Sequence, residues 1–391
     1  RFPVVVLTCN RAGLLDRTLL SLEEVRGVDD DLITVVQDGK VAAVEQVVRD
    51  HGLRLHQHEA KTNMRGGVPA DGARRIAEHY KYSLDYMFST TTAPAIIIAE
   101  DDFLFAPDFL EYFMAVAPLL ESDPTLFLAS AWNDNGFAGR TKDLRALRRT
   151  GFFPGLGWLL PRGLWERELS ATWPHEHWDH WLRDPRRHKG RDIVTPEIPR
   201  TYHIGIKGTF MNQDTHNKYF ASINLNRDPH FTWLDAEGVP VDTREAEQSA
   251  YDARLASLIK GATVITEPSQ LDALLEGVGV MYFSASIENQ ADFRAIATYF
   301  HIWHEILRGS YHGIHEIWWQ GSARLVLVNV REAKAAFTQF KGDAPTLRAM
   351  DFNGRRPPKA AAQPASTPTL SQAEIEGPAG TGRRGRGGGG G

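Results

Sequence analysis

The segment Ala95-Ile96-Ile97-Ile98-Ala99-Glu100-Asp101-Asp102 is the clearest structural signal in the chain, a five-residue apolar run that ends directly in three acids. A short apolar run rich in β-branched residues predicts a buried strand. Outward from it, the pattern predicts further strands at residues 3–7, 32–36 and 53–55, and helices at about residues 15–22, 41–51, 76–88 and 109–120. Strands that alternate with helices in this way predict an α/β fold, a parallel sheet with helices on both faces.

The composition is that of a globular protein and excludes several functions. Its 391 residues are 42% hydrophobic and 24% charged, with a formal net charge of −5. This mild acidity argues against a nucleic-acid partner, which needs a basic face. The single cysteine, Cys9, excludes intrachain disulfides and zinc sites built from cysteines. No stretch approaches 18 uninterrupted apolar residues, so none is predicted to span a bilayer.

The chain divides into an αβ part, a second αβ part and a tail. The boundaries predicted are 1–125 and 126–235 for two parts of one large domain, 236–350 for a smaller C-terminal αβ region, and 351–391 for a tail. In the second αβ region a helix is predicted at residues 291–307 and a strand at residues 325–330. The tail is rich in Pro, Gly and Arg and ends in five glycines, a composition that predicts disorder. A polar, Gly-rich loop is predicted at residues 63–72.

Polar side chains follow three of the predicted strands. These are Asn10 and Arg11, then Asp38, then the Glu100-Asp101-Asp102 triplet. Ligands of parallel sheets bind at the carboxyl ends of the strands, and carboxylate oxygens suit Mg²⁺ or Mn²⁺. With 49 acids in 391 positions, however, about 0.8 acidic triplets arise by chance, and a second triplet at residues 29–31 is interpreted as a solvated turn. The residues alone leave a metal site and a solvated sheet edge equally open.

The other chemical candidates are weaker. Two histidine clusters, at residues 175–180 and 301–304, lack the spacing of a zinc protease and are interpreted as structural. Asp179 lies between Trp178 and Trp181, where partial desolvation would raise its pKa and suit it to take a proton. Considered alone, Asp179 fits better as the cap of a short helix, as Asp108 does before the helix at residues 109–120. The tryptophans of residues 126–200 suit either sugar stacking or a core, and the core is favoured.

Several longer segments occur in order along the chain. They are Cys9-Asn10-Arg11, Glu100-Asp101-Asp102, Ala106-Pro107-Asp108-Phe109, Ser130-Ala131-Trp132-Asn133-Asp134-Asn135-Gly136, Phe152-Phe153-Pro154-Gly155-Leu156-Gly157-Trp158-Leu159-Leu160, Lys189-Gly190-Arg191, Arg200-Thr201-Tyr202-His203 and, more weakly, the segment near Tyr311 to Leu327. Together they resemble one known family, the eukaryotic β-1,2-N-acetylglucosaminyltransferases that act on N-glycans or on protein O-linked mannose. The resemblance covers roughly residues 3–330, at family-like spacing.

The resemblance implies a GT-A type, Rossmann-like glycosyltransferase fold with a mixed, mainly parallel sheet. It implies UDP-N-acetylglucosamine as donor and Mn²⁺ as cofactor, with Mg²⁺ as the alternative. Residues 1–125 then become the nucleotide-sugar part of the catalytic domain, and residues 126–235 its acceptor side. The residues that match family positions are Arg11, Asp38, His79, Glu100 and Asp101 for the donor, Asp102 for the metal, Asp179 for the catalytic base, and Arg191 and Trp178 on the acceptor side.

The implied reaction is inverting transfer in β-1,2 linkage to a terminal α-mannose of an N-glycan. The alternatives are the same transfer to O-linked mannose, suggested by the loop at residues 208–217, and a catalytically silent sugar- or nucleotide-binding module. The family also implies a lumenal Golgi domain with type II topology, whose membrane anchor precedes Arg1 in the full-length protein. The chain departs from the family at Gly39, Leu128 and Ile193, which stand where the family has bridged cysteines.

Overall fold

The computed structural model describes residues 1–59 and 72–355. The loop predicted at residues 63–72 therefore lies outside the described residues except for Gly72, which begins a helix. The predicted disorder of the tail lies outside them from residue 356 onward. Within the described residues, no helix is both long and apolar enough to cross a membrane.

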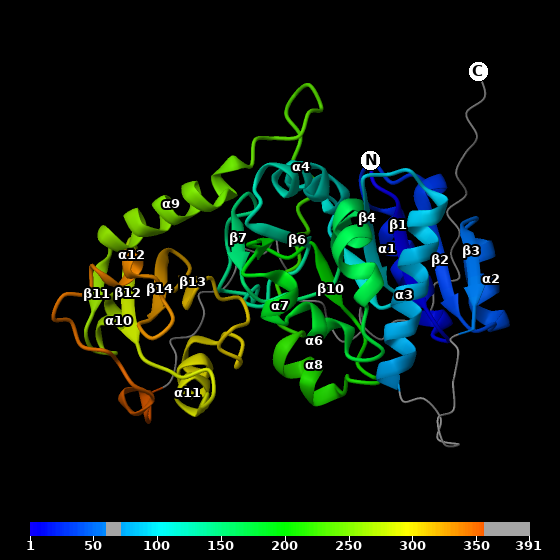
Figure 1. Cartoon of the computed structure of the whole chain (residues 1–391). Coiled ribbons are helices and arrows are strands. Elements are labelled where there is room, and N and C mark those ends of the chain that lie inside the picture. Colours follow the sequence, from blue (N-terminus) through cyan, green and yellow to red (C-terminus); the bar gives the residue numbers. More distant parts are fainter. Residues whose placement is uncertain (60–71, 356–391) are drawn as a thin grey trace.

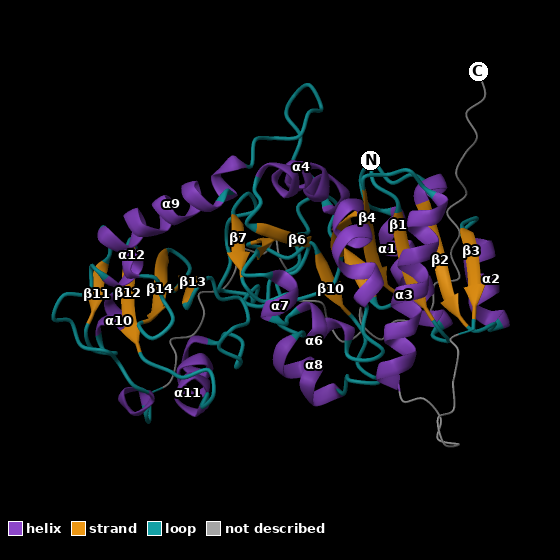
Figure 2. Ribbon diagram, viewed as in Figure 1, coloured by secondary structure: helices purple, strands orange, loops and turns teal. Residues whose placement is uncertain are grey.

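A mixed, mainly parallel sheet forms the larger part of the molecule (Figures 1 and 2). In the described part of the chain it has eight strands in the order β3-β2-β1-β4-β8-β6-β9-β7. Strands β3, β2, β1 and β4 are parallel, whereas β8 is antiparallel to both β4 and β6, and β7 is antiparallel to β9. The strands are β1 (Val4–Thr8), β2 (Ile33–Asp38), β3 (Arg54–His58), β4 (Ala95–Glu100), β6 (Leu126–Ser130), β7 (Leu147–Thr150), β8 (Trp158–Pro161) and β9 (Asp192–Pro196). The predicted α/β class is confirmed.

Helices cover both faces of this sheet. Successive residues of β1 point to opposite faces, so Val4 and Val6 pack with α1, α2 and α4, while Val5 and Leu7 pack with α3. Because both faces are buried, the strands are continuous apolar runs, the pattern from which they were predicted. The helices are α1 (Ala12–Glu23), α2 (Ala42–Asp50), α3 (Gly72–Thr90), α4 (Phe109–Ser122), α5 (Arg162–Leu164), α6 (Trp178–Leu182), α7 (Pro185–His188) and α8 (Gln213–Tyr219).

A smaller sheet and its helices form the C-terminal region, which Figure 1 shows beside the larger sheet. Its strand order is β11-β12-β14-β13, with only β13 antiparallel to its neighbour. Its elements are α9 (Gln248–Lys260), β11 (Thr263–Ile265), α10 (Gln270–Ala273), β12 (Val278–Phe283), α11 (Ala291–Phe300), β13 (Ile314–Trp319), β14 (Ala323–Asn329) and α12 (Ala335–Thr338). A separate antiparallel pair is formed by β5 (Phe103–Phe105) and β10 (Thr201–His203), which come from distant parts of the chain.

Buried ion pairs join the two sheets. The Glu316 carboxylate on β13 lies 3.1 Å from Arg148 on β7, and Trp318 donates a 2.8 Å hydrogen bond to Glu197, which follows β9. Arg148 also pairs with Glu197. Because these charged groups are almost fully shielded from water, each depends on its partner, and the contacts join the C-terminal region to the larger sheet.

Two local expectations were wrong. Asp108 does stand before α4, but its side chain caps nothing; instead it is fully buried and accepts hydrogen bonds from Arg200, Asn226 and Trp233 at 2.7 to 2.9 Å. The helix predicted at residues 291–307 ends at Phe300, because His301 adopts a left-handed conformation with φ of 50°. Long-range partners thus outweighed the local pattern at Asp108, whereas a change of backbone conformation ends α11.

Leu128 and Ile193, which replace cysteines of the resembling family, are register partners on β6 and β9. Both are buried. Cys9 is a free thiol. Packing between apolar side chains therefore stands where a covalent bridge is expected from the family.

Candidate functional site

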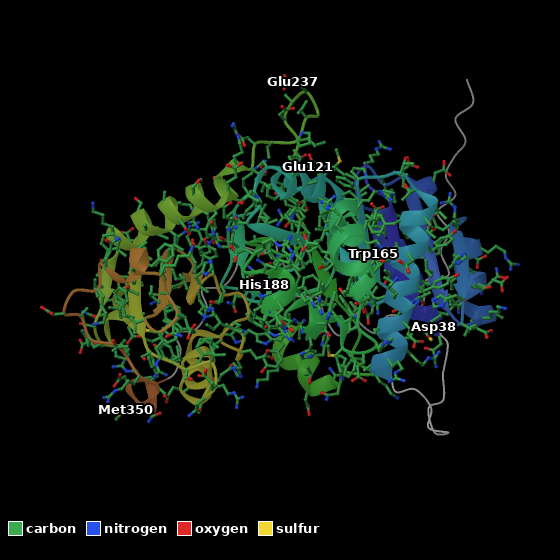
Figure 3. All side chains as sticks on the ribbon, viewed as in Figure 1. Asp38, Glu121, Trp165, His188, Glu237 and Met350 are labelled. Atoms are coloured by element: carbon green, nitrogen blue, oxygen red, sulfur yellow. The ribbon has the colours of Figure 1, made fainter. Side chains whose placement is uncertain are left out.

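The ends of three neighbouring parallel strands form the floor of the site. Leu7 on β1 is aligned with Glu100 on β4, and Thr8 on β1 with Gln37 on β2, so the residues after these strands meet at one edge. Figure 3 shows Asp38 at this edge. A cavity of about 460 Å³ opens there, and it is lined by all six residues predicted for the donor and the metal: Arg11, Asp38, His79, Glu100, Asp101 and Asp102. Residues up to 91 positions apart in sequence therefore converge, as the sheet topology predicts.

The three acids are held by hydrogen bonds from different elements. Thr8 donates a 2.7 Å hydrogen bond to Asp101, and Tyr80 on α3 donates one of 2.6 Å to Glu100. The Arg11 guanidinium forms an ion pair with Asp101 and lies 2.7 Å from Oδ2 of Asp102. Among the described residues, one guanidinium thus faces three carboxylates.

Burial and, after it, the neighbouring charges change the pKa values of two of the acids. Burial, followed by the charge of Asp102, raises the pKa of Glu100 to about 7. Burial also raises the pKa of Asp101 to about 6, with Arg11 opposing the rise and Asp102 adding to it. A further cation in the cavity would relieve this repulsion.

Asp102 is suited to be one ligand of a metal ion that also binds a substrate. Among the residues that the structure describes, its buried Oδ1 atom has no hydrogen-bond partner, and its Oδ2 atom lies 3.5 Å from Nε2 of His203. In residues 1–59 and 72–355 no group of three Asp, Glu, His or Cys side chains is arranged to hold a metal on its own. Ions such as Mg²⁺ are commonly held by one or two carboxylates together with substrate phosphates, so the free oxygen of Asp102 fits such an ion.

Asp38 and His79 line the cavity from the β2 side. Asp38 pairs with Arg75 at 3.0 Å, and His79 shares a 2.7 Å hydrogen bond with His58. Burial, reinforced by the neighbouring His58, lowers the pKa of His79 to about 3. His79 is therefore neutral near pH 7 and can offer a hydrogen bond without adding charge.

Asp179 lies beside this cavity, on the short helix α6. It is joined to the cavity through Trp178, whose ring stacks on Tyr80 with centroids 3.9 Å apart, while Tyr80 itself bonds Glu100. The Asp179 carboxylate remains one-third exposed and accepts a 2.6 Å hydrogen bond from Arg183. Asp179 is not a helix cap, since the residue before α6 is His177. Its surroundings also differ from those expected, because Trp178 turns into an aromatic cluster with Trp158 and Trp173.

The two acceptor-side candidates are not brought to the cavity. Arg191 pairs with Glu168 at 2.9 Å and lies over the ring of Phe127, and it is not among the residues lining the cavity. Trp178 is buried, at 8% exposure, so it has little surface for a ligand. Trp132, Trp158 and Trp165 are likewise core residues.

Sequence reasoning assigned no role to four residues that the structure places at the site. Arg75 and Tyr80 line the cavity from α3, His203 lines it from β10, and Gly205 contacts Asp102. Arg75 and His79 are four residues apart on α3 and so lie on one helical face. The predicted helix begins at residue 76, so Arg75 lies just outside it. The contacts of Tyr80, His203 and Gly205 link distant segments, and no local pattern indicates them.

Comparisons with known proteins agree on one family. The model of the GNT-I family matches residues 1–339. A curated relative from Arabidopsis thaliana, named alpha-1,3-mannosyl-glycoprotein 2-beta-N-acetylglucosaminyltransferase, is 34% identical over 337 residues, which cover 83% of this chain and 73% of the relative.

Solved structures are more distant. A mannosyltransferase from Pyrobaculum calidifontis in complex with GDP-Man and Mn²⁺ is 20% identical, covering 51% of this chain and 58% of its own, with a TM-score of 0.32. The glucosyl-3-phosphoglycerate synthase of Mycobacterium tuberculosis, in complex with Mn²⁺, UDP and glucosyl-3-phosphoglycerate, is 17% identical, covering 34% and 45%, with a TM-score of 0.23. Scores this low add nothing to the family match.

Proposed function

The chain belongs to the GNT-I family, and from this membership we propose that it transfers N-acetylglucosamine from UDP-N-acetylglucosamine, in β-1,2 linkage, to a terminal α-mannose of an N-glycan. The observation that carries the proposal is the convergence of Arg11, Asp38, His79 and the three acids on one cavity at the sheet's ligand edge. The proposal gives residues 1–125 the donor, residues 126–235 the acceptor side, and residues 236–350 a supporting role.

The donor side is proposed to bind the diphosphate of the nucleotide sugar with a cation and the rest of the molecule with hydrogen-bonding groups. Arg11 provides a fixed cation close to the position that a diphosphate takes, and its two ion pairs keep it pre-oriented for that contact. Asp38 and the neutral His79 offer hydrogen bonds to the uridine, and Asp101 and Glu100 shape the region nearer the sugar. Preorganised groups of this kind favour the charge that develops on departing UDP.

Asp102 is proposed to hold Mn²⁺, with Mg²⁺ as the alternative. The unpartnered Oδ1 atom, the surplus of carboxylates and the hard oxygen donors all suit such an ion. When bound, the ion supplies Lewis-acid stabilisation of the diphosphate leaving group. In the part of the chain that the structure describes, Arg11 is the one arginine that pairs with these acids.

Asp179 is proposed to be the general base. It takes the proton from the acceptor hydroxyl as that oxygen bonds to the anomeric carbon, while the bond from this carbon to the diphosphate breaks on the opposite face. One carboxylate is enough for such a direct displacement, and the α-linked donor becomes a β-linked product. The exposure of Asp179 supports this role, because an acceptor on a large glycan has to reach it from solvent.

Family membership also suggests where in the cell the protein acts. We propose a lumenal Golgi location, with a membrane anchor that lies outside residues 1–391. Both proposals rest on family membership alone.

Transfer to two acceptors tests the proposal. The protein is incubated with UDP-N-acetylglucosamine and Mn²⁺, together with a five-mannose N-glycan and an O-mannosyl peptide, and products are identified by mass and linkage. Product on the N-glycan alone supports the proposal. Product on the peptide alone moves the assignment to O-linked mannose and points to residues 208–217. Binding of UDP with transfer to neither acceptor supports the silent module.

A further inference from the structure

The motif at residues 130–136, at the end of β6, forms hydrogen bonds and an ion pair with a loop of the C-terminal region. Asn135 accepts a hydrogen bond from the backbone of Trp303 at 3.0 Å and donates to the carbonyls of Arg308 and Gly309 at 3.4 and 3.3 Å. The neighbouring Asp134 pairs with the Arg308 side chain at 3.3 Å. Two adjacent residues of the catalytic sheet thus hold both the backbone and the side chain of Arg308.

Gly309 shows how closely the loop is seated. Its φ of +61° lies in the left-handed region, and a Cβ added there would stand 2.5 Å from the Asn135 amide nitrogen. Only glycine allows both the conformation and the approach. The place of Arg308 is therefore set by its surroundings on both sides.

From this place Arg308 reaches the neighbourhood of Asp179. Its guanidinium lies 4.6 Å from the ring centroid of Phe152, and the guanidinium of Arg183 lies 4.5 Å from the same centroid. Arg183 in turn bonds Asp179 at 2.6 Å and the carbonyl of Phe153 at 2.9 Å. Contacts therefore run without interruption from Asp134 through Arg308, Phe152 and Arg183 to Asp179.

The two arginines at the middle of this path are flanked by one acid at each end. Arg308 is neutralised by the buried Asp134, and Arg183 by Asp179, so the two like-charged guanidinium groups can share one aromatic ring. Both arginines are nearly buried, at 16% and 13% side-chain exposure, so neither has free space in which to move. If Arg308 is removed, Asp134 keeps a buried charge without its partner. Phe152 also loses one packing partner, so the ring against which Arg183 is oriented is no longer fixed.

We propose that Arg308, supplied by the C-terminal region, is a positioning residue for Asp179 and acts on it through Phe152 and Arg183. The inference rests on the proposed function, in which Asp179 is the base. It gives the motif at residues 130–136 and the C-terminal region a direct part in the transfer reaction. Small displacements of a catalytic group cost rate without changing how tightly substrates bind.

The test is a double-mutant cycle on the intact protein. Arg308→Met is expected to lower kcat about tenfold while the KM values for both substrates change less than about twofold. Arg183→Met is expected to lower kcat more, and the double variant no further than Arg183→Met alone, because Arg308 acts through Arg183. Arg294→Met on the exposed face of α11 is the matched control and should behave as wild type. Asp134→Asn keeps the shape of the side chain but removes the negative charge that pairs with Arg308. It should therefore reproduce the loss in kcat.

Three results would overturn the inference. Additive losses in the double variant would show that the two arginines act separately. A rise in the KM for the acceptor at unchanged kcat would make Arg308 a substrate contact. Unchanged kcat in both Arg308→Met and Asp134→Asn would leave the path purely structural. Asp179→Asn is measured in the same series. If this variant keeps wild-type turnover, the assignment of Asp179 as the base fails. If it is inactive while Arg308→Met is fully active, only the positioning role of Arg308 is rejected.

Discussion

Replacing Gly205 by alanine tests the metal site without touching a charged residue. Gly205 follows β10, and a Cβ built on it would lie 2.5 Å from Oδ2 and 3.1 Å from Cγ of Asp102. To restore an ordinary contact of 3.4 Å, the carboxylate must withdraw by about 0.9 Å. A bond between a carboxylate and Mg²⁺ is only about 2.0–2.1 Å long, so a shift of this size removes the oxygen from its place.

The expected result is a selective loss of metal-dependent binding. Disturbing the setting of a metal ligand typically weakens metal binding about 10- to 100-fold, so UDP with Mn²⁺ should bind at least about tenfold more weakly, or about 1.4 kcal/mol. Titration calorimetry of UDP with and without Mn²⁺ measures this, and the loss of affinity should be larger with the metal than without it.

Gly208→Ala is the matched control for this experiment. Gly208 lines the same cavity, but its added Cβ would meet Met211 at 3.8 Å and Arg11 at 4.0 Å, both ordinary contacts. This variant should bind UDP as the wild type does. If Gly205→Ala is folded and keeps the full enhancement by Mn²⁺, Asp102 does not hold the metal.

Three further changes test the electrostatic reasoning. Glu316, 4% exposed among Arg148, Arg254 and Arg324, has a pKa that burial acts to raise but that these arginines lower to about 2. Glu316→Gln should lower the free energy of unfolding by about 3 kcal/mol at pH 7. The variant should also lack the loss of stability that the wild type shows as the pH falls from about 4 toward 2. Urea denaturation at several pH values measures both effects, and parallel stability curves for the two proteins would contradict this reasoning. Burial acts to lower the pKa of His51, but hydrogen bonds to Glu23 and Asp16 raise it above its usual value. Its contribution is present below about pH 6.5 and is lost as the pH rises through the raised pKa, so the wild type should lose stability there and His51→Gln should not. Tyr80→Phe keeps the stacking on Trp178 but deprives Glu100 of its 2.6 Å hydrogen bond. The rate of transfer should fall about tenfold at an unchanged melting temperature. Full activity of the variant would show that this hydrogen bond is not needed for transfer.

Much of the catalytic sheet could be predicted from local patterns. Strands β1, β2 and β4 are buried on both faces, and each therefore appears in the sequence as an apolar run. The convergence of Arg11, Asp38 and Asp102 followed from topology, because parallel strands end at the same edge.

The remaining features depend on contacts that no local pattern records. Asp108 looks like a helix cap, yet Arg200, Asn226 and Trp233, about 90 to 125 positions away, bind its carboxylate instead. Arg191 lies in a family-like segment, yet it pairs with Glu168 and is not among the residues that line the cavity. The link from Arg308 to Asp179 joins segments about 130 positions apart, and it depends on the packing of the C-terminal region against the larger sheet.

The most direct test of the central claim compares wild type and Asp179→Asn in transfer from UDP-N-acetylglucosamine with Mn²⁺ to a mannose-terminated N-glycan, with UDP binding measured on the same samples. We predict β-1,2-linked product from the wild type, and from the variant at least about a thousandfold slower transfer with unchanged UDP affinity. Wild-type turnover in the variant, or an α-linked product from either protein, would contradict direct displacement by a hydroxyl that Asp179 deprotonates.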